Sequence, residues 1–106
     1  MATCVVSGTL VDISETAISG ATVRAYTLSP FVSGTNFVTN SLVSTTTASD
    51  GTWSLTLART ANLTPARTVT IEFEYTNGTT GLVKEQYAVS VPNASTAAFT
   101  TLITLP

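Results

Sequence analysis

The sequence predicts an all-β protein that folds as a single antiparallel sandwich of seven short strands. Thr and Ser make up about a third of the 106 residues, and β-branched side chains suit the pleated surface of a strand. Several segments alternate apolar and polar residues with the period of two that a half-buried strand shows. Turn signals recur roughly every 8–12 residues, which is typical of a sandwich, and no segment of useful length shows helical periodicity.

The seven strands follow from this alternation and from the turn residues between the alternating segments. We predict them at Cys4–Val11, Ala21–Leu28, Leu42–Thr47, Thr52–Leu57, Thr68–Thr76, Leu82–Val91 and Phe99–Leu105. Seven strands in one chain of this length describe one domain, residues 1–106, of the immunoglobulin or transthyretin kind.

In the first half of the chain, the strand signal is strongest around Trp53. Asp50 and Gly51 form a turn, because Gly accepts a positive φ and the Asp side chain can accept hydrogen bonds from nearby amides. From Thr52 to Leu57 apolar residues then alternate with Thr and Ser. Trp53 is the only tryptophan, and its large apolar area places it at the centre of the expected core. The small inward residues of Ala21–Leu28 leave space for its ring.

In the second half, Thr68–Thr76 alternates most clearly, with Val, Ile, Phe and Tyr inward and with Thr and Glu outward in solvent. The segment Asn77–Gly81 has the composition of a hairpin turn, and Leu82–Val91 returns with a second apolar face. Pro92 ends it, and Phe99–Leu105 forms the last predicted strand.

The segment Ser29–Ser41 is the longest one without strand character, and it is unusually apolar for a loop. It carries Phe31, Val32, Phe37 and Val38 where a solvated loop would carry charge. Two interpretations remain open. The residues either fold back over an open end of the sandwich as a satellite cluster, or form an apolar patch that binds another protein chain.

Three stretches resemble carboxypeptidase regulatory-like, or transthyretin-like, domains: Val6–Asp12, Ile18–Val23 and Thr45–Leu57. Those domains have a first strand that ends in a short acidic turn, a Gly-Ala pair at the second strand, and an Asp-Gly turn before a strand with an aromatic residue. The resemblance covers about the first half of the chain. It implies a β-sandwich that serves as an accessory, adhesive or structural module, and such modules occur in phage structural proteins.

Composition excludes several classes of function. The net charge is −2, with four Lys and Arg residues in total and no histidine, so nucleic-acid binding and His-based catalysis are not expected. We predict no catalytic residue, no cofactor and no metal. The single cysteine, Cys4, cannot form an internal disulfide and is expected to be a small buried residue. No stretch is long and apolar enough for a membrane span, and the N-terminus lacks the features of a signal peptide.

Two groups of carboxylates offer weaker chemical interpretations. Asp12, Glu15 and Asp50 could meet around a loop and bind Ca²⁺, although their spacing matches no calcium motif. Glu72 and Glu74 share one strand face, at a separation that a hydrolase pair could use. The alternative for this pair is a solvated face that limits edge pairing or meets Arg and Lys across the sheet.

These observations predict a non-enzymatic structural protein of a tailed-phage virion, as a capsid decoration, head-fibre or tail-associated component. It would be made in the host cytoplasm and dock onto other virion or assembly proteins, or onto further copies of itself, through the Phe31–Val38 segment and a strand edge. The alternative is a carbohydrate-binding or adhesive module in which Tyr26, Tyr75, Tyr87 or the loop aromatics stack on sugars. The inward parity of Tyr75 and Tyr87 argues against these two.

Overall fold

The computed structural model describes residues 3–61, 63, 67–77 and 81–103. Within these residues the chain is β throughout apart from one short 3₁₀ helix, which confirms the all-β prediction. The elements are β1 (Thr3–Thr9), β2 (Thr22–Tyr26), β3 (Phe31–Ser33), β4 (Asn36–Val38), β5 (Val43–Thr46), β6 (Thr52–Ala58), β7 (Val69–Asn77), β8 (Gly81–Val89), β9 (Thr96–Ala98) and η1 (Phe99–Thr101).

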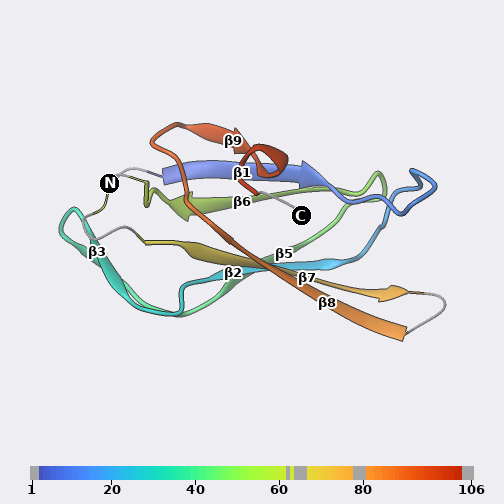
Figure 1. Cartoon of the computed structure of the whole chain (residues 1–106), viewed down its shortest axis with the longest axis horizontal. Coiled ribbons are helices and arrows are strands. Elements are labelled where there is room, and N and C mark those ends of the chain that lie inside the picture. The colour runs from blue at the N-terminus through green and yellow to red at the C-terminus, as the bar shows by residue number, and fades with distance from the viewer. Residues whose placement is uncertain (1–2, 62, 64–66, 78–80, 104–106) are drawn as a thin grey trace.

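The strands form two larger sheets in two layers and a separate hairpin (Figure 1). The three-stranded sheet has the order β6-β1-β9, and the four-stranded sheet has the order β5-β2-β7-β8. The hairpin of β3 and β4 lies at one end of the two layers, on the left of Figure 1. Strands β1 and β9 are parallel, and the other described pairs are antiparallel.

One hydrophobic core lies between the two larger sheets, because every second residue of their long strands points inward. The buried core residues are Cys4, Val6, Val23, Ala25, Trp53, Leu55, Leu57, Val69, Ile71, Phe73, Val89, Val91 and Phe99. Both layers contribute to this set, so neither sheet can unfold without exposing the inner face of the other. Cys4 is fully buried, as predicted.

Aromatic rings form the centre of this core around Trp53, as the sequence predicts. The Trp53 ring centroid lies 5.4 Å from that of Phe73 and 5.6 Å from that of Phe99, and both contacts are edge-to-face. Phe73 and Phe99 also contact each other, with centroids 5.1 Å apart. Edge-to-face aromatic pairs add stability beyond their buried area. This cluster therefore ties β6, β7 and the C-terminal η1 together.

Two glycines permit the close approaches that the core needs. Gly51 follows Asp50 with a φ of +83°, and a Cβ there would lie against the carbonyl oxygen of Leu10. The Asp50 carboxylate accepts hydrogen bonds from the amide and hydroxyl of Thr52, at 3.1 and 2.6 Å. A Cβ on Gly8 would lie 3.0 Å from Nε1 of Trp53. The predicted turn is thus present, and β1 leaves room for the indole.

The strand count and two segments differ from the prediction. Nine strands lie in the described residues, because Ser29–Ser41 contains the hairpin of β3 and β4 instead of an irregular loop. The predicted strand Phe99–Leu105 is also wrong: β9 precedes it, and a 3₁₀ turn replaces its first residues. The hydroxyl of Thr101 and the amide of Leu102 donate to carbonyls of the preceding turn, and these local bonds stop an extended strand. The end of that predicted strand, residues 104 and 105, lies outside the described residues.

Candidate functional site

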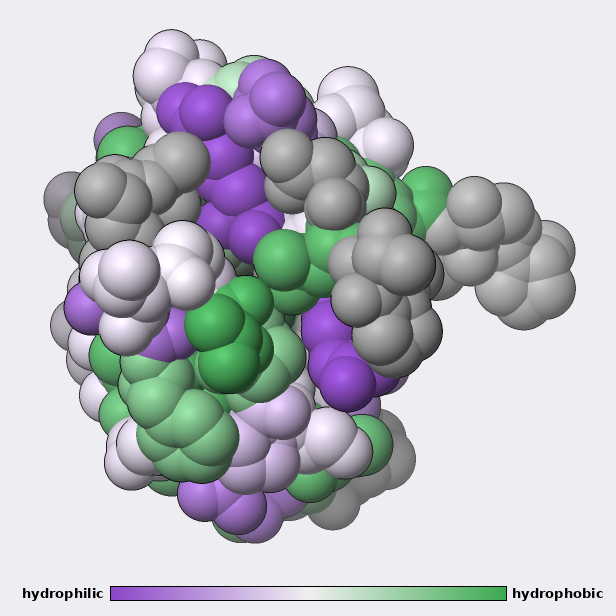
Figure 2. All heavy atoms as spheres, turned by 90° about the vertical axis from the view of Figure 1, so that its left-hand side faces the viewer, coloured by the Kyte–Doolittle hydropathy of each residue, from purple (hydrophilic) through white to green (hydrophobic). Residues whose placement is uncertain are grey.

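Exposed apolar side chains gather at the end of the molecule that carries the hairpin. The described residues include eight exposed large hydrophobic side chains, and five of them fall between residues 28 and 43. We call these five the apolar end: Leu28, Val32, Phe37, Leu42 and Val43. Figure 2 shows apolar residues grouped on the lower part of this end, beside hydrophilic ones. Exposed apolar side chains that gather in this way are typical of an interaction surface, and the other three, Val11, Ile13 and Leu82, lie elsewhere in the chain.

The β3–β4 hairpin has one buried and one exposed face because its side chains alternate. Phe31 is 6% exposed, whereas Val32 and Phe37 are 59% and 68% exposed. Val32 and Phe37 are direct cross-strand partners, so their side chains lie side by side on the outward face. Gly34, with a φ of +61°, begins the two-residue turn that sets this register.

The sequence predicted Phe31, Val32, Phe37 and Val38 either as a cluster that covers the end of the sandwich or as a patch that binds another chain. The structure places two of them in each role's position: Phe31 and Val38 face inward, and Val32 and Phe37 face outward. Phe31 folds back over the open end of the layers, and Val38 is partly buried beside it. Of the four, Val32 and Phe37 are exposed. Phe31, at 6% exposure, packs inward and supports the hairpin, and its predicted role in binding a partner stays a prediction.

A cavity of about 130 Å³ lies beneath the hairpin and opens at the apolar end. Phe31 and Val38 line it from the hairpin, and Val43, Leu57 and Val69 line it from the two larger sheets. An apolar cavity of about 150 Å³ in another protein is large enough to hold benzene. The hairpin therefore leaves a partly open pocket between itself and the two larger sheets.

The stretch of chain that supplies the apolar end carries no charge. No charged residue occurs between Arg24 and Asp50 in the sequence. Side chains of this kind gain binding free energy from apolar burial.

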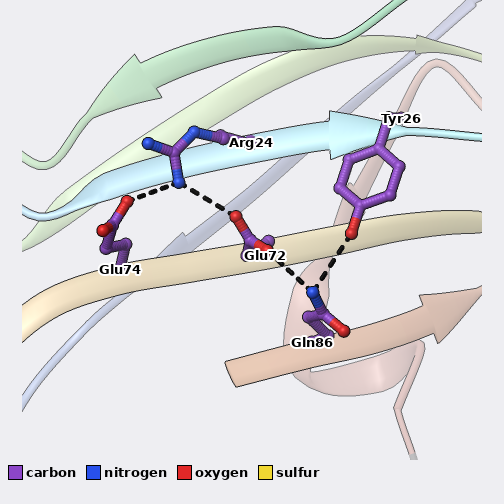
Figure 3. Close-up of polar contacts among 5 residues, drawn as sticks. All are labelled: Arg24, Tyr26, Glu72, Glu74 and Gln86. Atoms are coloured by element: carbon purple, nitrogen blue, oxygen red, sulfur yellow. Dashed lines mark hydrogen bonds and ion pairs between the residues drawn. The ribbon is translucent and has the colours of Figure 1, made fainter. Parts of the chain in front are cut away.

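The second candidate region is a polar network on the outer face of the four-stranded sheet (Figure 3). The Arg24 guanidinium binds both Glu72 and Glu74, at 2.9 and 2.6 Å. Nε2 of Gln86 donates to the other Glu72 oxygen at 2.7 Å and to the Tyr26 hydroxyl at 3.2 Å. These residues come from β2, β7 and β8, so the network fastens three neighbouring strands together.

The network buries Glu72, which the sequence places on a solvated face. Glu72 is only 8% exposed. Its hydrogen bond from Gln86, together with the Arg24 guanidinium, holds the pKa of the Glu72 carboxyl below its ordinary value. Glu72 and Glu74 share one guanidinium, which is the pairing with Arg across the sheet that the sequence allowed. An ionised carboxylate held in this way stabilises the sheet and is a poor general acid.

The three tyrosines are half-buried, and each contacts neighbouring side chains. The Tyr75 hydroxyl donates to Glu85 at 3.2 Å, and burial raises the pKa of Tyr75. The Tyr87 ring packs against Phe99 with centroids 5.7 Å apart, and its pKa is also raised by burial. Tyr26 accepts the hydrogen bond from Gln86 described above. None of the three rings is fully exposed.

Two of the predicted calcium ligands, Asp12 and Asp50, use their carboxylates to accept hydrogen bonds within turns. The Asp12 carboxylate accepts hydrogen bonds from the amide and hydroxyl of Ser14 and from the amide of Thr16, and these bonds lower the pKa of Asp12. Asp50 binds Thr52 in the same manner, which lowers its pKa. Across the described residues, no group of three or more His, Cys, Asp or Glu side chains lies close enough to hold a metal ion.

Comparisons with known proteins give no relative for this chain: neither the models of known protein families nor the curated proteins contain a match. The described part of the chain has no helix with the length and apolar character that a membrane crossing requires.

The sequence analysis named Val32 and Phe37, which are exposed, but not Leu28, Leu42 and Val43, which are exposed as well. A signal for the hairpin was present, because Phe-Val pairs flank the Ser-Gly-Thr-Asn segment on both sides. Mirrored apolar pairs around a Gly-containing turn are typical of a short hairpin.

Proposed function

We propose that the protein is a non-enzymatic structural component of a larger assembly and docks to its neighbours through the apolar end. The observation that carries this proposal is the concentration of exposed apolar side chains between Leu28 and Val43, on a stretch without charge. Burying the exposed parts of Val32 and Phe37 in an interface would contribute on the order of 1–2 kcal/mol each. The hairpin presents both side chains together, which suits them to act as anchors at the centre of a contact.

The assembly that we propose is a tailed-phage virion, with the protein as a capsid decoration, head-fibre or tail-associated component. Support comes from the resemblance of Val6–Asp12, Ile18–Val23 and Thr45–Leu57 to transthyretin-like modules of phage structural proteins. In this proposal the two larger sheets are the halves of an immunoglobulin- or transthyretin-like sandwich. The partners are other virion or assembly proteins with apolar surfaces.

Attachment of surface variants to the particle tests the proposal. The double variant Val32→Ser/Phe37→Ser removes both anchors, and we expect it to lose attachment while its Tm stays within a few degrees of the wild type. Leu82→Ser is a matched control, since Leu82 is 64% exposed on β8 and lies outside the apolar end. The control should attach normally, and undiminished attachment of the double variant would refute docking through this surface.

A further inference from the structure

The pocket beneath the β3–β4 hairpin, which we call the hairpin pocket, is bounded by strands from all three sheets. β2, β5 and β7 of the four-stranded sheet, β6 of the three-stranded sheet and both strands of the hairpin line it. Three of its lining residues, Ala25, Leu57 and Val69, belong to the buried core. The pairing of their strands holds these walls in place. Walls fixed by the fold cost little ordering free energy when a ligand binds.

The chemistry of the lining favours an apolar ligand. No charged residue occurs among the described residues that line the pocket. Two of the lining hydroxyl groups already have acceptors: Thr27 donates to the Ser29 carbonyl oxygen at 2.7 Å, and Thr39 donates to the Ser41 hydroxyl at 2.9 Å. A charged ligand would lose its hydration here without gaining a countercharge. An apolar ligand instead gains free energy by leaving water.

The volume of the hairpin pocket sets the size of the ligand. The pocket holds about 130 Å³, slightly less than the apolar cavity of about 150 Å³ that binds benzene in another protein. Drug-sized ligands occupy about 300–1,000 Å³, so the pocket suits only a much smaller molecule. Few voids in a packed domain are larger than a water molecule, and this one is large enough for a ring.

We propose that the hairpin pocket is a binding site for one small, uncharged, apolar molecule of about the size of benzene. The ligand lies between the hairpin and the two larger sheets, against Phe31 and Val38 on one side and Leu57 and Val69 on the other. The site is separate from the docking anchors, because neither Val32 nor Phe37 lines it. This inference therefore does not rest on the proposed function.

Titration with benzene, followed by NMR of the methyl groups in the full chain, tests the site. We expect saturable shifts of the Val38, Val43 and Val69 methyl signals, because these residues line the pocket. Benzoate has the same ring with a negative charge. It should bind roughly tenfold more weakly or worse, because the pocket offers its carboxylate no countercharge.

Two substitutions fill the pocket from different strands and sharpen the test. Ala25→Leu adds volume from β2, and Val43→Phe adds volume from β5. Each should weaken benzene binding roughly tenfold or more. Val43 is 48% exposed, so Val43→Phe keeps the test available if Ala25→Leu does not fold. Thermal unfolding by circular dichroism shows which variants are folded. Val32→Ser/Phe37→Ser is the matched control and should bind benzene as the wild type does.

Shifts that do not saturate, or that spread equally to the Val11 and Leu82 methyl groups, would overturn the proposal. Unchanged binding in a folded filling variant would also overturn it, because the ligand would then lie elsewhere. Loss of binding only in Val32→Ser/Phe37→Ser would assign the ligand to the exposed face of the hairpin and refute the pocket. Particle attachment by a wild type that does not bind benzene would refute this inference and leave the proposed function standing. Benzene binding by a protein that never attaches would do the reverse.

Discussion

The two larger sheets share one core but differ completely in charge. The strands of the three-stranded sheet contain no charged residue, whereas the strands of the four-stranded sheet contain five: Arg24, Glu72, Glu74, Lys84 and Glu85. The inner faces are equivalent, because both supply the same buried cluster. The difference teaches that ion pairs help to hold neighbouring strands together in one sheet, whereas the strands of the other sheet are held without charge.

The largest loss of stability should follow removal of a core aromatic ring, and it should be equal for the two sheets. Trp53→Ala removes the central ring of β6, and Phe73→Ala removes its neighbour on β7. Each should lower the free energy of unfolding by about 3–5 kcal/mol, the usual loss for a buried aromatic side chain. Urea unfolding measures both. If one variant lost far less than the other, the two sheets would not share a core equally.

Next in size is the contrast between the two phenylalanines of the hairpin. Phe31→Ala removes a buried ring and should cost about 3 kcal/mol, at the low end for aromatic side chains because its site borders a cavity. Phe37→Ala removes an exposed ring and should stay within about 0.5 kcal/mol of the wild type. Equal losses in chemical denaturation would show that the exposed face of the hairpin also supports the fold.

A smaller effect is expected where β1 passes beneath the indole. Gly8→Ala adds a methyl group at 3.0 to 3.2 Å from three atoms of Trp53, and overpacking of this kind costs about 1–3 kcal/mol. Ser7→Ala, at the exposed neighbouring position, is the control and should be close to neutral. A Gly8→Ala protein with an unchanged denaturation midpoint would mean that the Trp53 ring can move aside.

The smallest effect should be a change in how the stability of the protein depends on pH, through Glu72 of the four-stranded sheet. The folded-state pKa of Glu72 lies below its ordinary value of 4.5, because Gln86 donates to the carboxylate and Arg24 binds it. The stabilising contribution of Glu72 is therefore complete above about pH 4.5 and is lost as the pH falls through the lower folded-state pKa. Glu72→Gln should flatten the fall in Tm between about pH 5 and pH 3.

Asp12 and Asp50 also have lowered pKa values and contribute in the same acid range. The Glu72→Gln protein should accordingly keep part of its acid sensitivity. An acid profile identical to that of the wild type would show that the network on the four-stranded sheet does not couple Glu72 to stability.

The long strands could be predicted from the sequence because their alternation is a local pattern. β7 shows this most clearly: Val69, Ile71 and Phe73 are buried, as their positions indicate. The short strands β3, β4 and β9 have three residues each, too few for alternation to be distinguished from a loop. Their existence depends on tertiary pairing, and for β9 on a parallel partner far away in the sequence.

The candidate site was predictable only in part, for a similar reason. The apolar character of the Phe31–Val38 segment is visible in the sequence, but the inward turn of Phe31 depends on the register of the hairpin. The burial of Glu72 was also invisible, because the β2–β7 register sets Arg24 directly across from it. Pairings between strands distant in the chain decide which apolar groups are exposed and which charges are buried.

The most direct measurement of the central claim is sedimentation of a lysate from the native source through a density gradient, with this protein followed by mass spectrometry. We predict co-migration with a large particle, and loss of that co-migration when Val32→Ser/Phe37→Ser replaces the wild type. Recovery of the wild-type protein only as a free small species would contradict the assembly role.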